Sequence, residues 1–251
     1  MQMVLLTALG VGGATVVGVI LGFIFKKISH KFSDAVMGFA AGVMLAAAVI
    51  GLILPSLEGG GGPLPLLITV LGILLGAVCI SLLDRLVPHL HRMVGADTES
   101  HGGGNERVGK ILLFVLAIAI HNLPEGIAAG VGAASESAQA LAVAGGIALQ
   151  NIPEGMVIIA PLLAAGVGKG KTFLLAASTG LIEVVGTFIG FFAVSISQAV
   201  LPFALAFAGG TMLYVISDEM IPETHAHGNE RSATYALLFG FCLMLAMDYF
   251  L

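Results

Sequence analysis

The chain has 251 residues, of which 58% are hydrophobic and only 10% charged; its mean hydropathy is +1.05 and its formal net charge is −5. An average soluble domain is about 25% charged and needs that polarity to cover its surface, so this composition excludes a soluble globular protein. The ten basic residues form no dense patch, which leaves no case for nucleic-acid binding.

Apolar runs of about 20 residues predict an all-α integral membrane protein with eight transmembrane helices. In chain order, the expected spans are 2–25, 35–56, 63–87, 109–133, 139–166, 172–195, 200–221 and 232–250. We interpret the first as an uncleaved span, because no basic region precedes its apolar stretch and no convincing cleavage site follows. We expect one transmembrane domain, 1–251, which includes a His- and Gly-containing cytoplasmic loop at about 88–108.

The basic residues indicate the orientation of these spans. All ten lie in or beside the odd-numbered connections: Lys26, Lys27, Lys31, Arg85, Arg92, Arg107, Lys110, Lys169, Lys171 and Arg231. Short loops rich in Lys and Arg stay in the cytoplasm, so we expect both termini outside the cytoplasm. The same distribution supports an even number of spans.

Two similar polar motifs lie in the fourth and fifth spans, HNLPEG at 121–126 and QNIPEG at 150–155. Residues at i and i+4 share one helical face, so each motif presents a pair of ligand-type side chains. With Glu183 of the sixth span, three glutamates lie in the membrane without a basic partner, and each charged side chain there costs at least about 2.5 to 3.5 kcal/mol. Protonated, hydrogen-bonded carboxyl groups are one explanation, but we favour a cation site.

Pro124 and Pro153 add to this prediction. Each removes a backbone hydrogen bond beside a polar pair, which predicts a kink and a free carbonyl oxygen, tolerated in the membrane only next to protein or a wet cavity. The polar turn at 135–139 lies near the midpoint between the motifs, so the two spans run antiparallel and Glu125 and Glu154 are expected to meet.

A weaker likeness connects FAAGVML at 39–45 with FAGGTML at 207–213, each followed by a proline near the helix end. It predicts an inverted repeat of helices 1–3 and 6–8 around a central pair, helices 4 and 5. Many transporters with a site at the membrane midplane have this plan.

The paired motifs, in an eight-span chain with outside termini, resemble those of the ZIP (Zrt/Irt-like) metal transporters, and the QN form is similar to the bacterial GufA-type branch. The resemblance implies transport, without enzymatic activity, of zinc and also iron, manganese or cadmium toward the cytoplasm across a bacterial inner (plasma) membrane. The metal is then the transported substrate, and no cofactor is expected. The implied metal ligands are His121, Asn122, Glu125, Gln150, Asn151 and Glu154, with Glu183 and Met44 as further contacts. In the family this site is often binuclear. Asn151 occupies a position that is acidic in some relatives, so a second metal is expected to bind less firmly here.

Several residues outside the motifs are candidates for the ends of the pathway. Glu58 is either an entrance carboxylate or a solvated acid at a helix end. For the acids and histidines at the inner end of the seventh span we favour a metal exit over simple solvation: Asp218, Glu219, Glu223, His225 and His227. Three histidines in the loop are candidates for metal binding in a segment that also fits a flexible linker: His89, His91 and His101.

Two other functions fit the sequence less well. An intramembrane zinc-dependent hydrolase could hold its metal on His121, Glu125 and Glu154, but the chain has no HExxH stretch and its duplicated motif suits transport better. A proton-coupled carrier of an organic solute predicts aromatic or basic contacts, and the chain has no tryptophan and no basic residue in mid-membrane. The oligomeric state stays open, a homodimer included.

Overall fold

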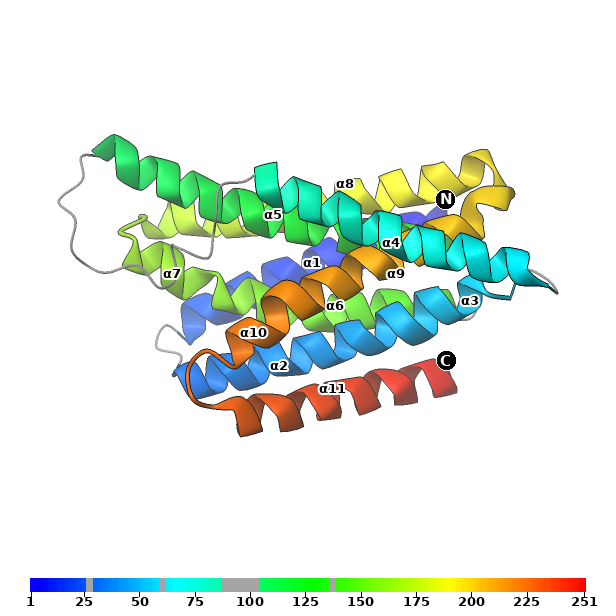
Figure 1. The fold of residues 1–251 in the computed structure, drawn as a ribbon. Coiled ribbons are helices and arrows are strands. Elements are labelled where there is room, and N and C mark those ends of the chain that lie inside the picture. The colour runs from blue at the N-terminus through cyan, green and yellow to red at the C-terminus, as the bar shows by residue number, and fades with distance from the viewer. Residues whose placement is uncertain (26–28, 59–61, 87–103, 136–138) are drawn as a thin grey trace.

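A computed structural model describes residues 1–25, 29–58, 62–86, 104–135 and 139–251 (Figure 1). The secondary structure of these residues is entirely helical. The helices are α1 (Gln2–Ile24), α2 (His30–Ala46), α3 (Leu54–Ser56), α4 (Pro63–Leu86), α5 (Gly104–Ser135), α6 (Gln139–Val157), α7 (Ile159–Ala164), α8 (Lys169–Ile196), α9 (Leu201–Val215), α10 (Ile221–Thr224) and α11 (Glu230–Phe250).

The predicted all-α membrane fold is confirmed. Among the described residues, seven helices are long and apolar enough to cross a membrane: 2–24, 30–56, 63–83, 140–164, 169–196, 201–224 and 230–250. Helix α5 contains the remaining predicted span, 109–133. A helix of 23 residues such as α1 is about 35 Å long at 1.5 Å per residue, enough for a hydrocarbon core of about 30 Å. Both termini lie at the same end of the helix bundle, as an even number of spans requires (Figure 1).

Two spans contain a π-helical segment in place of regular α-helix. Ala47–Ile53 connects α2 to α3, and Ile216–Met220 connects α9 to α10. Each is followed by a proline, Pro55 or Pro222, at the start of the next short helix. A π-helical turn shifts the direction in which later side chains point and often occurs at functional sites.

The helices pack in pairs. Helix α5 lies along α8, α1 along α6 and α8, α2 along α11, and α4 along α9. Glycines allow the closest approaches: a Cβ atom on Gly130 of α5 would collide with the backbone oxygen of Thr187 in α8, and one on Gly42 of α2 would collide with that of Leu237 in α11. Lipid supplies no hydrophobic force between helices, so such close packing contributes much of their association.

The core lies between these pairs, where α2, α5, α6 and α9 meet. Its fully buried side chains include Met44, Leu52, Ile147 and Met212. Helices α4 and α11 are largely exposed along their apolar outer faces, as expected of helices that contact lipid. Helices α5 and α6, which carry the two polar motifs, are therefore central.

Candidate metal site

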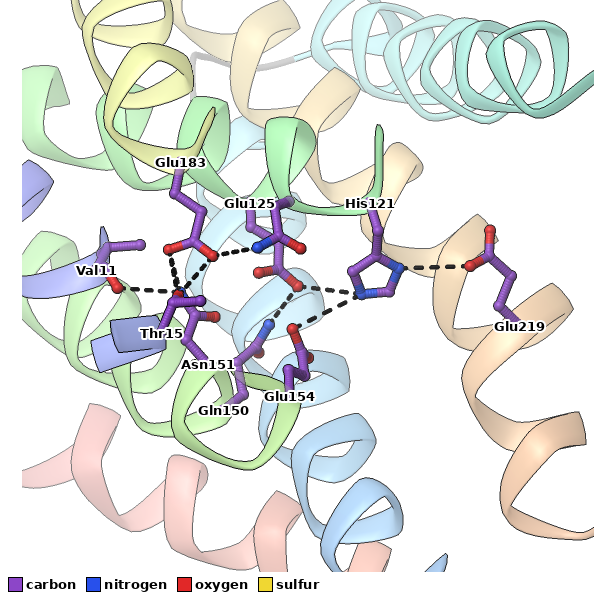
Figure 2. Close-up of polar contacts among 10 residues, drawn as sticks. Val11, Thr15, His121, Glu125, Gln150, Asn151, Glu154, Glu183 and Glu219 are labelled. Atoms are coloured by element: carbon purple, nitrogen blue, oxygen red, sulfur yellow. Dashed lines mark hydrogen bonds and ion pairs between the residues drawn. The ribbon is translucent and has the colours of Figure 1, made fainter. Parts of the chain in front are cut away.

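Helices α5 and α6 bring the two motifs together. Both helices continue through their proline, Pro124 in α5 and Pro153 in α6. The i and i+4 residues of the motifs point toward one another across the pair (Figure 2). The expected meeting of the two motif glutamates is therefore observed.

Three of these side chains form a group that we call the metal triad: His121, Glu125 and Glu154. One potential ligand atom from each lies within 4.8 Å of the others. The Nε2 atom of His121 is 3.5 Å from Oε1 of Glu125 and 3.9 Å from Oε2 of Glu154. Gln150 adjoins the triad, because its Nε2 donates a hydrogen bond of 2.7 Å to Oε1 of Glu125. One imidazole and two carboxylates are a ligand set suited to Zn²⁺ and similar divalent ions.

The oxygens around the triad lack donors. Oε2 of Glu125, Oε1 of Gln150 and both carboxylate oxygens of Glu154 are buried and have no hydrogen-bond partner among the described residues. A buried polar atom without a partner is costly, and the oxygens of an ionised carboxylate or an amide can only accept. A bound cation would satisfy them, so the arrangement has the electrostatic character of a cation site.

The opposite edge of the His121 ring faces a different acid. Its Nδ1 atom lies 3.5 Å from Oε2 of Glu219, which the π-helical segment Ile216–Met220 carries (Figure 2). Histidines that bind a metal through one ring nitrogen commonly present the other to a carboxylate, which fixes the tautomer and the ring orientation. Glu219, predicted from the sequence as an exit residue, thus reaches the centre of the membrane site.

The remaining motif residues lie on a neighbouring face. The amides of Asn122 and Asn151 both donate to the carboxylate of Glu183 in α8, and so does the hydroxyl of Thr15 in α1. All four side chains are buried. Thr15 was not predicted from the sequence, because a threonine in an apolar span is common and its partner is 168 residues away.

The other predicted residues differ in their burial. Met44 is fully buried among the apolar side chains of the core, and Glu58 is exposed just beyond α3. Asp218 and Glu223 are exposed. The roles of Met44, Glu58, Asp218 and Glu223 as metal contacts stay predictions. The candidate loop histidines lie outside the described residues: His89, His91 and His101.

The two histidines that follow the seventh span have protein partners. The Nδ1 atom of His225 lies 2.7 Å from the carbonyl oxygen of Ile221. His227 pairs through Nδ1 with Oδ1 of Asp34, a buried residue of α2, at 2.9 Å, and its ring stacks on that of His30. Asp34 and His30 were not singled out from the sequence, since their proximity to His227 depends on the packing of the ends of α2 and α11.

Comparison with known proteins gives a consistent result. Residues 105–248 match the family model described as "ZIP Zinc transporter". The chain is 42% identical to "Zinc transporter GufA" of Myxococcus xanthus, with 97% of each chain covered. It is 39% identical to "Zinc transporter ZIPB" of Bordetella bronchiseptica, covering 94% of this chain and 77% of the relative. It is 31% identical to "Zinc transporter ZIP11" of Homo sapiens, covering 94% of this chain and 93% of the relative.

These matches cover both polar motifs and more than half of the chain. They confirm the resemblance drawn from HNLPEG and QNIPEG, and they favour a transporter over the intramembrane hydrolase. The chain belongs to the ZIP zinc transporter family.

Proposed function

We propose that this protein carries zinc, or a related divalent metal ion such as iron, manganese or cadmium, across the membrane toward the cytoplasm through the metal triad. The observation that carries the proposal is a buried group of His121, Glu125 and Glu154 whose surrounding oxygens lack donors. Its relatives are named as zinc transporters, which supports zinc as the substrate.

The ligand set suits a site that must bind and release. His121 supplies a nitrogen, Glu125 and Glu154 supply carboxylate oxygens, and rotation of the Gln150 side chain would add an amide oxygen. No thiolate takes part, so the affinity for zinc stays below that of a structural cysteine site. Glu219 holds the His121 ring so that Nε2 faces the two glutamates, and it offers a carboxylate on the far side of the ring for a departing ion. Direct metal ligation by Asn122, Asn151, Glu183 or Met44, which the family resemblance implies, is not part of this proposal.

The proposed orientation assigns an entrance and an exit to the pathway. With both termini outside the cytoplasm, Glu58 lies at the entrance, and Asp218, Glu223, His225 and His227 lie near the exit. The placement of all ten basic residues in or beside the odd-numbered connections supports this orientation. Labelling of a cysteine introduced at Leu251 with a membrane-impermeant reagent in intact cells tests it, and labelling only after the cells are broken would contradict it.

The inverted repeat is also part of the proposal. In such a repeat, α1, α2 and α4 correspond to α8, α9 and α11, and α5 corresponds to α6. The pair α1–α6 then corresponds to α8–α5, and the pair α2–α11 corresponds to α9–α4. All four pairs pack closely. The π-helical segments fall in helices that this correspondence relates. This pairing supports two halves of opposite topology within one transmembrane domain, 1–251. A homodimer stays a prediction, to be checked by mass measurement in detergent.

Zinc flux into liposomes containing the purified protein tests the function. We expect the wild type to move zinc down its gradient and Glu125→Ala to abolish this movement while staying folded. Glu230→Ala, which removes an exposed acid from the first turn of α11, is the matched control and should keep wild-type flux. Absence of flux in the folded wild type, or full flux in Glu125→Ala, would contradict the proposal.

A further inference from the structure

Beside the metal triad lies a second polar group, which we call the Glu183 cluster: Thr15, Asn122, Asn151 and Glu183. Four different helices supply its members, α1, α5, α6 and α8. Their exposed fractions are 1%, 2%, 0% and 0%, so the cluster has no contact with solvent. Figure 2 shows Glu183, Thr15 and Asn151 next to Glu125 and Gln150.

The Glu183 carboxylate is fully supplied with hydrogen-bond donors. The Thr15 hydroxyl lies 2.7 Å from Oε1 and 2.8 Å from Oε2, so its single proton sits between the two oxygens. Asn122 donates to Oε1, and Asn151 donates to Oε2 at 2.7 Å. The second N–H of the Asn151 amide is also used, in a bond of 3.3 Å to the carbonyl oxygen of Val11.

The cluster and the triad therefore differ in kind although they are neighbours. Around the triad, four buried oxygens have no hydrogen-bond partner among the described residues, and a cation would satisfy them, whereas in the cluster only Oδ1 of Asn151 is in this position. Around Glu183, each carboxylate oxygen already accepts from neutral N–H and O–H groups. A lone pair that accepts a hydrogen bond is not free for a metal, and a donor N–H pointing at the same place repels one.

Close packing fixes the position of Thr15. A Cβ atom on Gly155 of α6 would collide with the Thr15 carbonyl oxygen, and one on Gly180 of α8 would lie 3.2 Å from the Thr15 Cβ. Thr15 is thus enclosed between the helix that carries Asn151 and the helix that carries Glu183. This packing holds the Thr15 hydroxyl within hydrogen-bond distance of both oxygens of Glu183.

We propose that the Glu183 cluster is a hydrogen-bonded position that limits the membrane site to one metal ion, bound at the triad, and that Thr15 is its positioning residue. This inference rests on the proposed function, since it concerns the number of ions at the same site. Thr15 is the one member from α1 and the one donor within reach of both oxygens of Glu183. Asn151 contributes by presenting an N–H group where a carboxylate would present an oxygen.

The number of zinc ions bound by the purified full-length protein tests the proposal, measured by elemental analysis and by calorimetric titration with zinc. Zinc bound elsewhere on the chain cancels when variants are compared, because all of them share it. Asn151→Asp replaces the NH2 donor by a second, negatively charged oxygen and should gain one zinc ion per chain. Thr15→Val keeps the shape of the side chain but removes its donor, and should gain a second, weaker zinc ion.

Two variants serve as controls for the role of Thr15. Thr15→Ser keeps the hydroxyl and should bind as many zinc ions as the wild type. Thr7→Val makes the same change at another buried threonine of α1 and should also leave the count unchanged. An unchanged count in Asn151→Asp would overturn the one-ion limit, and an unchanged count and affinity in Thr15→Val would overturn the positioning role. If Thr15→Val fails to fold, Thr15→Ala removes the same hydroxyl, and an unchanged count and affinity in that variant would overturn the positioning role.

Failure of this inference can be separated from failure of the proposed function. Glu154→Gln should lose one zinc ion relative to the wild type, because Glu154 belongs to the triad. Loss of none would contradict the triad as the transport site. Loss of two zinc ions would mean that a second ion, which also depends on Glu154, already binds at Glu183 in the wild type. That result would overturn the inference and leave the proposed transport function in place.

Discussion

Neutralising Glu154 should separate the stability of the metal-free protein from its response to zinc. Glu154 is 7% exposed, and neither of its carboxylate oxygens has a hydrogen-bond partner among the described residues. A charge in mid-membrane without a hydrogen-bond partner costs at least about 2.5 to 3.5 kcal/mol, so Glu154→Gln, which keeps the shape of the side chain, is expected to be at least as stable as the wild type without metal.

Zinc should stabilise the two proteins very differently. Loss of an outer partner of a metal ligand typically weakens binding about 10- to 100-fold, so we expect at least about 100-fold for a direct carboxylate ligand. At a zinc concentration of about 100 times the wild-type Kd, bound metal stabilises the wild type by about 2.7 kcal/mol and a variant with a 100-fold larger Kd by only about 0.4 kcal/mol. Most of the zinc-dependent stabilisation should therefore disappear.

The assay is thermal unfolding in detergent with and without zinc, beside zinc flux in liposomes. Glu230→Gln makes the same chemical change at an exposed residue of α11 and should behave as the wild type. A Glu154→Gln protein that keeps the full zinc-dependent stabilisation and flux would refute the assignment of Glu154 as a ligand. Reduced stability of this variant without metal would instead point to a structural role for the carboxylate.

Three further predictions concern protonation, packing and the loop at about 88–108. Zinc affinity, measured by titration, should fall at least about tenfold between pH 7.5 and 5.5, because a proton on the imidazole of His121 competes with the metal and histidine ordinarily has a pKa of about 6.5; equal affinity at both pH values would exclude the imidazole as a ligand. Gly130→Ala should lower the melting temperature, since its Cβ would collide with the Thr187 backbone, whereas Gly13→Ala, with nothing within 4 Å, should not; equal melting temperatures would contradict the close packing of α5 on α8. Replacing the three histidines of the loop at 88–108 by alanine should change the zinc dependence of flux but leave flux intact, and its complete loss in a folded protein would make the loop part of the pathway.

Much of the fold follows from local patterns in the sequence. Each expected span coincides with a helix or with successive helical segments to within a few residues; the span at 200–221, for example, corresponds to the helical stretch 201–224. This agreement has a simple cause, since a chain in lipid must satisfy its backbone hydrogen bonds within each segment. The bends inside the spans could not be predicted in the same way, because π-helical turns such as Ala47–Ile53 contain no proline or polar residue that marks them in advance.

The metal triad could also be predicted, because its parts repeat. His121 and Glu125 are four residues apart, as are Gln150 and Glu154, and a short polar turn between the two helices makes them antiparallel, so helical geometry alone brings the two pairs to similar depth. The family resemblance added the identity of the substrate.

The sequence by itself determined that this is a membrane protein of eight helices whose two polar motifs meet between the fourth and fifth helices, because composition, span length and i to i+4 spacing are local properties. Only the tertiary structure decided which polar groups adjoin the triad and which pair with one another. It placed Glu219 against His121 and Thr15 against Glu183, contacts between residues 98 and 168 positions apart. Such pairs depend on how closely glycine-rich helices approach one another and on the register of π-helical turns, and neither property is encoded in any single stretch of the chain.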